Sequence, residues 1–128
     1  MSFSGWLFAA MYDRMLAGVE KAGLRDRRAR LLESACGRVL EIGAGTGANL
    51  PLYGSNIEAL TVTEPEAPMA RRLAKRLRER ERSRAVELVE ASAEQLPMPD
   101  GQFDTVVSTL VLCTVPDPLR ALREAWRV

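Results

Sequence analysis

Histidine is absent from all 128 residues of this chain, and cysteine occurs only twice, at Cys36 and Cys113. The two cysteines lie too far apart in the sequence to form a metal-ligand cluster. The usual zinc and iron sites are therefore excluded, and a disulfide is not expected. Unpaired thiols are typical of a reducing compartment, so we expect a cytoplasmic location.

The chain also lacks an excess of either charge. Lys and Arg total 18 and Asp and Glu total 17, so the net charge of +1 creates no bulk field toward nucleic acid or an anionic membrane. One local basic run covers residues 71–82, where Met69, Leu73 and Leu77 recur at four-residue spacing. This spacing predicts a helix with an apolar inner stripe and arginines facing solvent. No aromatic residue lies among the arginines, so nucleic acid is not an expected partner.

The chain lacks a long apolar run. The stretch from Phe3 to Tyr12 is much shorter than the roughly 20 residues of a membrane span, and no basic segment precedes it as in a cleavable signal. Apolar residues nevertheless recur there with helical spacing, at Trp6, Leu7, Phe8, Met11, Tyr12, Met15, Leu16 and Val19. We expect an N-terminal helix, about residues 1–20, that packs as a lid over the sheet or a cofactor. A weak contact with a membrane surface is the alternative.

Helical and strand-like segments alternate along the rest of the chain. The patterns predict helices at about 3–18, 26–35, the basic run and from 118 onward, and strands at 38–42, within 58–65, at the start of 86–97 and at 103–108. This alternation indicates one α/β domain over residues 1–128, with a doubly wound Rossmann-like parallel sheet in three α/β/α layers. Right-handed crossovers would bring Glu41, Glu64, Ser92 and Thr109 to one rim of that sheet.

The segment from Val39 to Asn49 carries the most information about a ligand. A short apolar run leads directly into three alternating glycines, Gly43, Gly45 and Gly47. Glycine permits a positive φ and a close approach of the backbone to a bound molecule, and a helix N-terminus that follows would offer unpaired N–H groups. We therefore expect a buried strand that ends in a turn holding a nucleotide-like cofactor.

Two cofactor classes fit this turn. Gly43, Gly45 and Ala48 satisfy the G-x-G-x-x-[GA] pattern of NAD- and FAD-binding proteins. Glu41 precedes the turn on a strand expected to be buried, and a buried charge needs a partner. That partner is either a cationic or hydrogen-bond-donating part of a ligand, or the glycine turn itself, which Glu41 would then brace. Glu64 lies about twenty residues past the glycines, where both classes place a carboxylate for the ribose hydroxyls.

An acidic residue followed by G-x-G-x-G, here Glu41 and residues 43–47, resembles the first motif of the class I S-adenosylmethionine (SAM) dependent methyltransferases. The similarity continues through the A-E-x-L-P turn at 93–97 and the strand at 103–108, and it covers nearly the whole chain. The G-x-N-L-P segment at 47–51 and the Tyr-Asp pair at 12–13 resemble the ubiquinone/menaquinone-biosynthesis and methyltransferase-like type in particular.

The resemblance implies a SAM-binding shell in which Glu41 and Glu64 converge on one hollow. Glu64 would hold the ribose, and Met69 would pack near the adenine ring or be an ordinary core residue. Ser92 stands where the family often has an acid for the adenine amino group, so this contact would be a weaker hydroxyl or backbone one. The implied cofactor shell is Glu41, Gly43, Ala44, Gly45, Thr46, Gly47, Glu64, Pro65, Met69, Ser92, Ala93, Glu94 and Thr109.

The acceptor implied by the resemblance is a small molecule. Tyr12, Leu110 and Cys113 are the candidates for positioning it, or they are ordinary packing residues. A general base is not required, because the sulfonium of SAM is a good leaving group and the enzyme mainly aligns the reactants. An oxidoreductase would commonly need a positioned acid or base beside the nicotinamide, and no recognisable pair is present.

The family sheet has seven strands, whereas this sequence ends in the helix after the fourth, so the last three strands are expected to be missing. The strand at 103–108 would then be an edge with unpaired backbone groups, which a second copy could cover by forming a homodimer. Two alternatives to an active methyltransferase follow: a remnant that binds SAM without turnover, and an NAD(P)-binding oxidoreductase domain.

Overall fold

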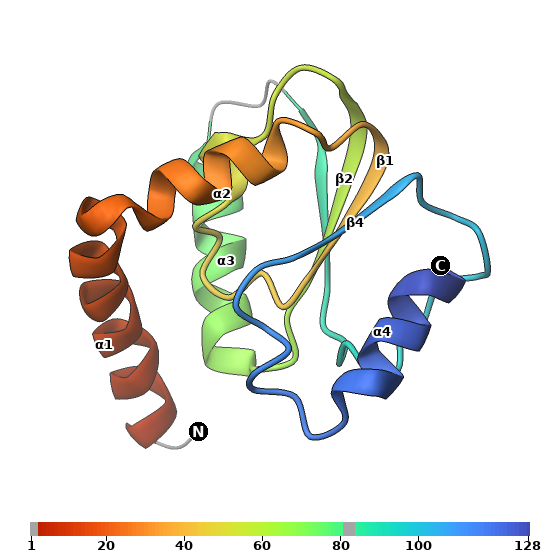
Figure 1. The fold of residues 1–128 in the computed structure, drawn as a ribbon. Helices are drawn as coiled ribbons and strands as arrows, with labels where there is room; N and C mark the ends of the chain where they lie inside the picture. The colour runs from red at the N-terminus through yellow and green to blue at the C-terminus, as the bar shows by residue number, and fades with distance from the viewer. Residues whose placement is uncertain (1–2, 81–83) are drawn as a thin grey trace.

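The computed structural model describes residues 3–80 and 84–128, with side chains from Leu7 onward in the first helix. The elements follow in the order α1 (Phe3–Val19), η1 (Glu20–Leu24), α2 (Arg25–Leu32), β1 (Gly37–Ile42), η2 (Leu50–Leu52), β2 (Ile57–Thr63), α3 (Ala67–Glu79), β3 (Val86–Val89), β4 (Thr105–Ser108) and α4 (Pro118–Arg127). The predicted alternation of helices and strands is confirmed (Figure 1). The side chain of Trp6 and the end of the predicted basic run at residues 81 and 82 lie outside the described residues.

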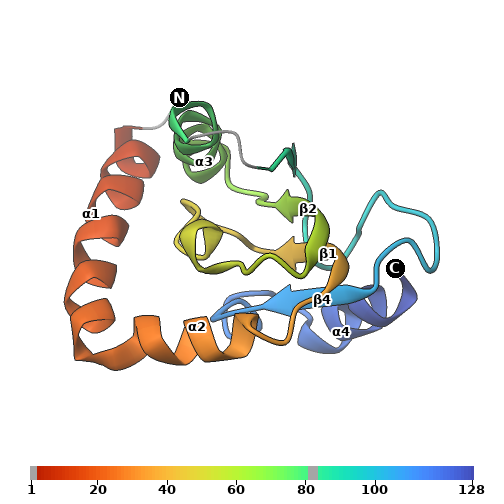
Figure 2. The ribbon, with the colours of Figure 1, turned by 90° about the horizontal axis from the view of Figure 1, so that it is seen from above.

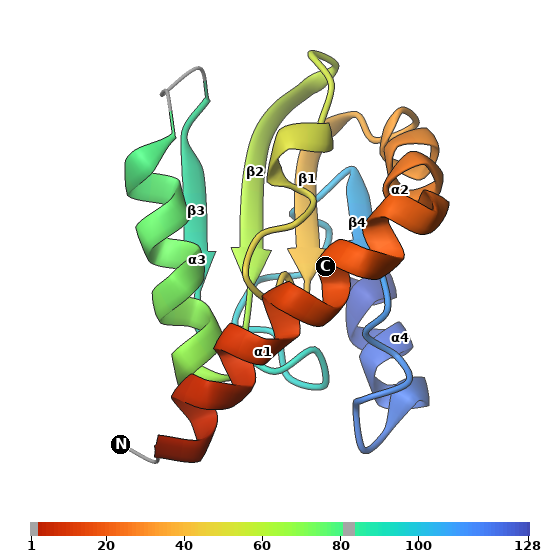
Figure 3. The ribbon, with the colours of Figure 1, turned by 90° about the vertical axis from the view of Figure 1, so that its left-hand side faces the viewer.

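The four strands form one parallel sheet in the order β3-β2-β1-β4. β1 is a central strand, and its Leu40 pairs with Thr61 of β2 on one side and with Val106 of β4 on the other. Parallel strands direct their carboxyl ends to the same edge of the sheet, as the arrowheads of β1 and β2 show in Figure 3. From β1 the chain adds β2 and β3 on one side, and it then returns to add β4 on the other side of β1. This change of direction makes the sheet doubly wound.

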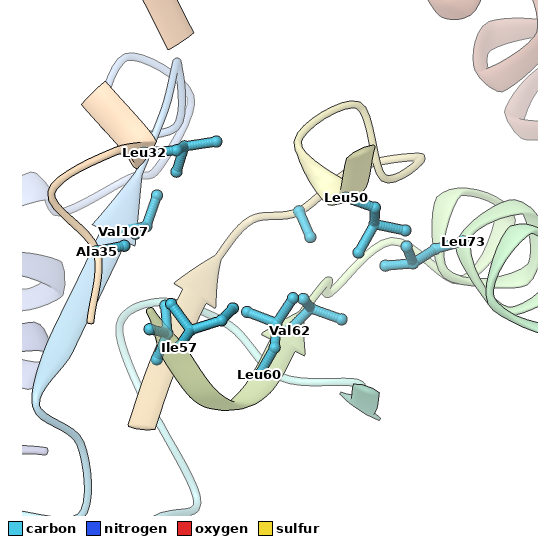
Figure 4. Packing of buried hydrophobic residues seen from close by; sticks show 10 residues of the cluster. Leu32, Ala35, Leu50, Ile57, Leu60, Val62, Leu73 and Val107 are labelled. Carbon is cyan, nitrogen blue, oxygen red and sulfur yellow. The ribbon is translucent and has the colours of Figure 1, made fainter. Parts of the chain in front are cut away.

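Alternating residues of β1 supply two apolar layers. Val39 faces a core that includes Leu32 of α2, Leu50 and Leu73 of α3 (Figure 4). The neighbouring Leu40 faces the other core, which α4 covers with Ala121. Because helices cover both faces, β1 reads as a nearly continuous apolar run, as expected for a central parallel strand. The predicted three-layer α/β/α arrangement is therefore confirmed (Figure 2).

Element boundaries differ from the sequence prediction at two places. α2 ends at Leu32 instead of near residue 35, because Ser34 closes a turn by hydrogen bonding through its hydroxyl to the Leu31 carbonyl. α1 is joined to α2 by η1, a π-type turn in which Gly23 has a φ of 105°. The helix after the glycines is short, as predicted, and it is the single 3₁₀ turn η2 with Pro51 in its first turn.

The strand predicted at 103–108 is β4, and it lies at the edge of the described sheet. Its Thr105 and Val106, together with Leu122 and Trp126 of α4, line a shallow groove along that edge. Trp126 is 93% exposed, so this end of α4 has no covering layer in the described chain. The prediction of an open edge is thus confirmed.

Candidate cofactor-binding site

A crevice of about 520 Å³ opens at the carboxyl ends of the strands. Ligands of doubly wound sheets bind at this edge, outside the ends of strands that diverge in opposite directions. Every strand end contributes to the wall, and α1 closes one side. The lining residues are Phe8, Tyr12, Gly43, Gly45, Glu64, Pro65, Glu66, Pro68, Met69, Ser92, Ala93, Glu94, Leu110, Val111, Thr114, Val115 and Pro116.

Two glycines of the turn face this crevice. Gly43 and Gly45 have φ values of 62° and 59°, which residues other than glycine rarely adopt. A Cβ at Gly43 would lie 2.6 Å from a methyl carbon of Val111, so this position is closed by packing. A Cβ at Gly45 would meet nothing nearer than Met69 at 3.8 Å and Tyr12 at 4.0 Å. The backbone at Gly45 is therefore open toward the crevice.

The third glycine serves packing instead. A Cβ at Gly47 would lie 2.8 Å from both Leu50 and Leu73, which are buried in the core. Gly47 is not part of the crevice lining, and neither are Ala44 and Thr46. These three residues belonged to the predicted cofactor shell on the basis of the motif. Ala44 and Thr46 line a small cavity that adjoins the crevice, and Gly47 lines neither of these two cavities.

Glu64 connects the end of β2 to the glycine turn. Its Oε2 accepts a hydrogen bond from the Gly45 amide at 2.8 Å, and its Oε1 accepts one from the Glu66 amide at 2.9 Å. The residue is buried, and burial raises the pKa of its carboxyl, while the two amide hydrogen bonds act in the opposite direction. Each oxygen retains a second lone pair, so the carboxylate can still accept hydrogen bonds from a ligand.

Glu41 lies on the other side of the turn from Glu64. Its Oε1 accepts a hydrogen bond from Asn49 Nδ2 at 2.8 Å, and its Oε2 accepts one from the Tyr53 hydroxyl at 2.7 Å. Burial raises the pKa of the Glu41 carboxyl, and the hydrogen bonds from Tyr53 and Asn49 oppose that rise. Arg28 completes the network by donating to the Asn49 side-chain oxygen.

Glu41 and Glu64 line two adjoining cavities, and their convergence on one bound molecule stays a prediction. Glu64 lines the large crevice, whereas Glu41 lines a separate cavity of about 30 Å³ with Thr46, Asn49 and Thr109. The two cavities adjoin, because Gly43 lines both. Asn49 and Tyr53, from the segment after the glycine turn, satisfy the hydrogen-bonding need of the buried Glu41 carboxylate.

Residues from the ends of β2 and β3 form the opposite wall. Met69, from the first turns of α3, and Ala93 are buried and line the crevice. Ser92 also lines it, but the Ser92 hydroxyl accepts a hydrogen bond from the Glu94 amide at 3.2 Å. Glu94 in turn accepts a hydrogen bond from the Asp117 amide at 2.8 Å. Glu94 therefore ties the loop before α4 to the crevice.

The segment after β4 contributes three of the predicted residues in different ways. Leu110 lines the crevice and is the one non-glycine residue with a positive φ in the described chain, at 59°. Such a conformation is costly for a branched side chain and persists only where the surroundings impose it. Thr109 accepts a hydrogen bond from Asn49 in the small cavity. Cys113 is exposed and is not part of the crevice lining.

α1 is attached to the site through Asp13. Asp13 accepts a hydrogen bond from the Thr46 hydroxyl at 2.5 Å and forms ion pairs with Arg72 at 2.9 Å and Arg76 at 3.5 Å. Phe8 and Tyr12 of the attached helix line the crevice, and a role of α1 as a lid over a cofactor stays a prediction. Asp13 was not among the predicted site residues, although a lone carboxylate inside an apolar helix indicates a partner elsewhere in the fold.

Three geometric features thus coincide: a doubly wound sheet, an open crevice at its carboxyl edge, and a glycine turn held by a buried acid. Comparison with known proteins agrees, since the family described as "Methyltransferase domain" matches residues 40–128. The chain belongs to this methyltransferase family, and its fold is that of the class I SAM-dependent methyltransferases.

Individual relatives point the same way. The chain is 35% identical over 127 residues to a phosphatidylethanolamine N-methyltransferase of Cereibacter sphaeroides, covering 99% of this chain and 60% of that protein. It is 38% identical over 124 residues to a demethylmenaquinone methyltransferase of Roseiflexus sp. (strain RS-1), and the match covers 91% of this chain and 50% of that protein. A crystal structure of a SAM-dependent methyltransferase from Thermotoga maritima is 33% identical, with a TM-score of 0.60, and the match covers 92% of this chain and 55% of that one. The chain thus spans about half the length of the curated relatives it matches.

No helix in residues 3–80 and 84–128 is long and apolar enough to cross a membrane. In the same part of the chain, no group of three or more His, Cys, Asp or Glu side chains is placed to hold a metal ion.

Proposed function

We propose that the crevice binds SAM and that the whole protein transfers the methyl group of SAM to a small-molecule acceptor. The observation that carries this proposal is the buried Glu64 carboxylate, held in place by the amides of Gly45 and Glu66 at the crevice wall. With one lone pair free on each oxygen, this carboxylate suits the two adjacent hydroxyls of a ribose.

The glycine turn supports the same ligand. The missing side chain of Gly45 leaves space between the backbone and Met69, where a part of the cofactor can lie against the chain. Met69 and Ala93 offer apolar contacts for an adenine ring, and Ser92 offers a hydroxyl that already accepts one hydrogen bond. The crevice volume falls within the range of about 300–1,000 Å³ that is typical of small-molecule sites.

When bound, SAM supplies both the methyl group and the leaving group. The contribution of the chain is to hold the acceptor in line and to keep water out. Tyr12 suits this task, because burial and the nearby Glu64 carboxylate raise the pKa of its phenol above 10. The phenol therefore stays protonated at neutral pH and can donate a hydrogen bond to an acceptor. Leu110 supplies an apolar contact at the same wall, and Cys113 has the weakest claim of the three predicted residues.

The acceptor is proposed to be a nucleophile on a small molecule with an apolar body. Phe8, Leu110, Val111 and Val115 make one side of the crevice largely apolar. The names of two relatives specify phosphatidylethanolamine and demethylmenaquinone as acceptors, and both combine a reactive atom with long apolar chains. Fold alone does not choose among nitrogen, oxygen, sulfur and carbon nucleophiles.

Transfer of a labelled methyl group tests this proposal. The protein is incubated with methyl-labelled SAM and with vesicles of phosphatidylethanolamine or with demethylmenaquinone, and lipid extracts are counted. We expect labelled product from wild type and much less product from Glu64→Gln at the same SAM concentration below saturation. Tight SAM binding without product from either acceptor would favour the alternative of a remnant without turnover, and binding of NAD in place of SAM would favour the oxidoreductase alternative.

A second copy of the chain is our proposal for the cover of the β4 edge. The groove between β4 and α4 is apolar at Leu122 and Trp126, and an open strand edge readily pairs with another strand. Light scattering at increasing protein concentration measures this association, and Trp126→Glu should reduce it. A cytoplasmic location stays a prediction from the sequence.

A further inference from the structure

The outer side of α1 is apolar and exposed. Leu7, Phe8, Met11, Met15 and Val19 are each between 44% and 70% exposed. At about 100° per residue these five side chains fall within an arc of about 120° on one side of the helix. Large apolar side chains grouped in this way on a surface mark an interaction site. We call these five residues the outer strip.

The outer strip is not needed to pack α1 against the rest of the described chain. The inner side of α1 already has its own contacts, since Ala9 is buried and Asp13 is tied to the glycine turn and to α3. A helix that is apolar nearly all round is normally enclosed by protein. α1 instead runs along the outside of the molecule and forms an outer corner with α2 (Figures 2 and 3).

Basic side chains accompany this strip. The exposed charged residues from Leu7 to the end of α2 are five basic ones, Arg14, Lys21, Arg25, Arg27 and Arg30, and one acidic one, Asp26. The other two acids of this stretch are partly buried and engaged, Asp13 with Arg72 and Glu20 with Arg28. A chain whose net charge is only +1 therefore concentrates positive charge on the surface of its first two helices.

We propose that α1 is a membrane-surface helix that lies on an anionic lipid bilayer. The outer strip enters the boundary between head groups and acyl chains, and the arginines that follow on α2 contact the lipid phosphates. An apolar face combined with nearby lysine and arginine is the composition of helices that lie in the plane of the membrane interface. α1 has 17 residues and is too short and too polar to cross the bilayer.

The outer strip also reaches the crevice. Phe8 is 61% exposed and lines the crevice at the same time, next to Tyr12. A molecule dissolved in the bilayer could therefore enter the crevice beside α1 without crossing bulk water. This consequence rests on the proposed function, whereas binding to the membrane surface does not.

Vesicle flotation of the 128-residue protein tests the proposal. Vesicles of phosphatidylcholine alone are compared with vesicles of phosphatidylcholine and phosphatidylglycerol, without SAM or acceptor. We expect the protein to float with the anionic vesicles and to be released by high salt, because charge attraction at a bilayer surface is screened within about one Debye length. Removing the positive charge of one arginine should lower the partition coefficient about fivefold.

Two matched pairs of variants locate the surface. Met15→Glu on the outer strip should lower vesicle binding at least tenfold, and Leu119→Glu on α4 should leave it unchanged. The two side chains are matched in exposure, at 70% for Met15 and 66% for Leu119. Arg25→Glu with Arg27→Glu should abolish the preference for anionic vesicles, and Arg120→Glu with Arg123→Glu on α4 should not. Circular dichroism and urea unfolding confirm that each variant is folded, and Met15 is not part of the crevice lining.

Three results would overturn the proposal. The first is no flotation of folded wild type with anionic vesicles. The second is equal loss of binding in both members of a matched pair, which would indicate attraction without a defined surface. The third is a dimer in solution that Met15→Glu disrupts while vesicle binding is absent, because the outer strip would then be an interface between two copies. Failure of methyl transfer with intact vesicle binding would count against the proposed function alone.

Discussion

The Glu64 carboxylate accepts a hydrogen bond from the Gly45 amide at 2.8 Å, across the gap between β2 and the glycine turn. This bond joins the two sequence features with the strongest claim to a cofactor, an acid after the second strand and a glycine after the first. It also fixes the carboxylate at the crevice wall with lone pairs available. The Glu64 carboxylate and the glycine turn are therefore held in place relative to each other before any ligand binds.

Glu64→Gln should weaken SAM binding by about 10- to 100-fold, because a hydrogen bond to a charged group contributes roughly 1.5–3 kcal/mol. The amide retains one oxygen for the Gly45 amide, so the fold should survive. Titration calorimetry measures the change. Glu58→Gln, on the same strand but exposed, is the control and should bind SAM as wild type does. Equal affinity of wild type and Glu64→Gln would remove Glu64 from the site.

The glycines of the turn should separate binding from stability. Gly45→Ala introduces about 1–2 kcal/mol of backbone strain and places a methyl group in the crevice, so SAM binding should be lost from a folded protein. Gly47→Ala adds a clash with Leu50 and Leu73 to similar strain, and it should lower the free energy of unfolding by about 3 kcal/mol or more. Urea unfolding and SAM titration of both variants distinguish the two effects. The same loss of stability in both would contradict the assignment.

The fold could be predicted from the sequence because its signals are local and repeated. β1 is buried from Val39 to Ile42 because helices cover both faces of the sheet. The apolar stripe of α3 at Met69, Leu73 and Leu77 follows from helical spacing alone. The edge position of β4 followed from the family resemblance and the chain length together. The exact end of α2 depended on one hydroxyl of Ser34, which spacing does not report.

The site was predicted less completely, because a motif does not tell which side of a turn each residue faces. Ten of the predicted residues line the crevice, namely Tyr12, Gly43, Gly45, Glu64, Pro65, Met69, Ser92, Ala93, Glu94 and Leu110. Glu41 and Thr46 line the small adjoining cavity instead. Tyr53 and Asn49 donate hydrogen bonds to Glu41, and Asp13 accepts one from Thr46. Those contacts join segments up to 33 residues apart and leave no periodic trace in the sequence.

Glu41 should make stability depend on pH. Its folded-state pKa is raised above 4.5 by burial, so the folded protein binds a proton more tightly than the unfolded chain. The free energy of unfolding should therefore fall as the pH rises from about 4.5 through the raised pKa, by at most about 1.4 kcal/mol per pH unit for one proton.

Glu41→Gln should flatten this part of the profile, since the amide does not titrate. Glu64 has a raised pKa as well and contributes in the same direction, so the comparison is made in both single variants and in the double variant. Thermal unfolding between pH 4 and pH 8 gives the profiles. If the Glu41→Gln profile has the same slope as that of wild type, the raised pKa of the buried Glu41 carboxyl is contradicted.

Asp13→Asn should loosen α1 from the site. The amide loses the charge that holds Arg72 and Arg76, and the loss of such contacts at a partly buried position costs about 1 kcal/mol. Limited proteolysis should then cleave within α1 faster than in wild type, while the sheet remains protected. Asp26→Asn on α2, where the carboxylate is exposed, serves as the control. Unchanged protection of α1 would show that other contacts hold it.

The most direct measurement is a calorimetric titration of the protein with SAM, with its demethylated product S-adenosylhomocysteine, and with NAD. The account predicts saturable one-to-one binding of SAM and of S-adenosylhomocysteine, loss of both in Gly45→Ala, and no heat with NAD. Saturable binding of NAD by a protein that ignores SAM would contradict it.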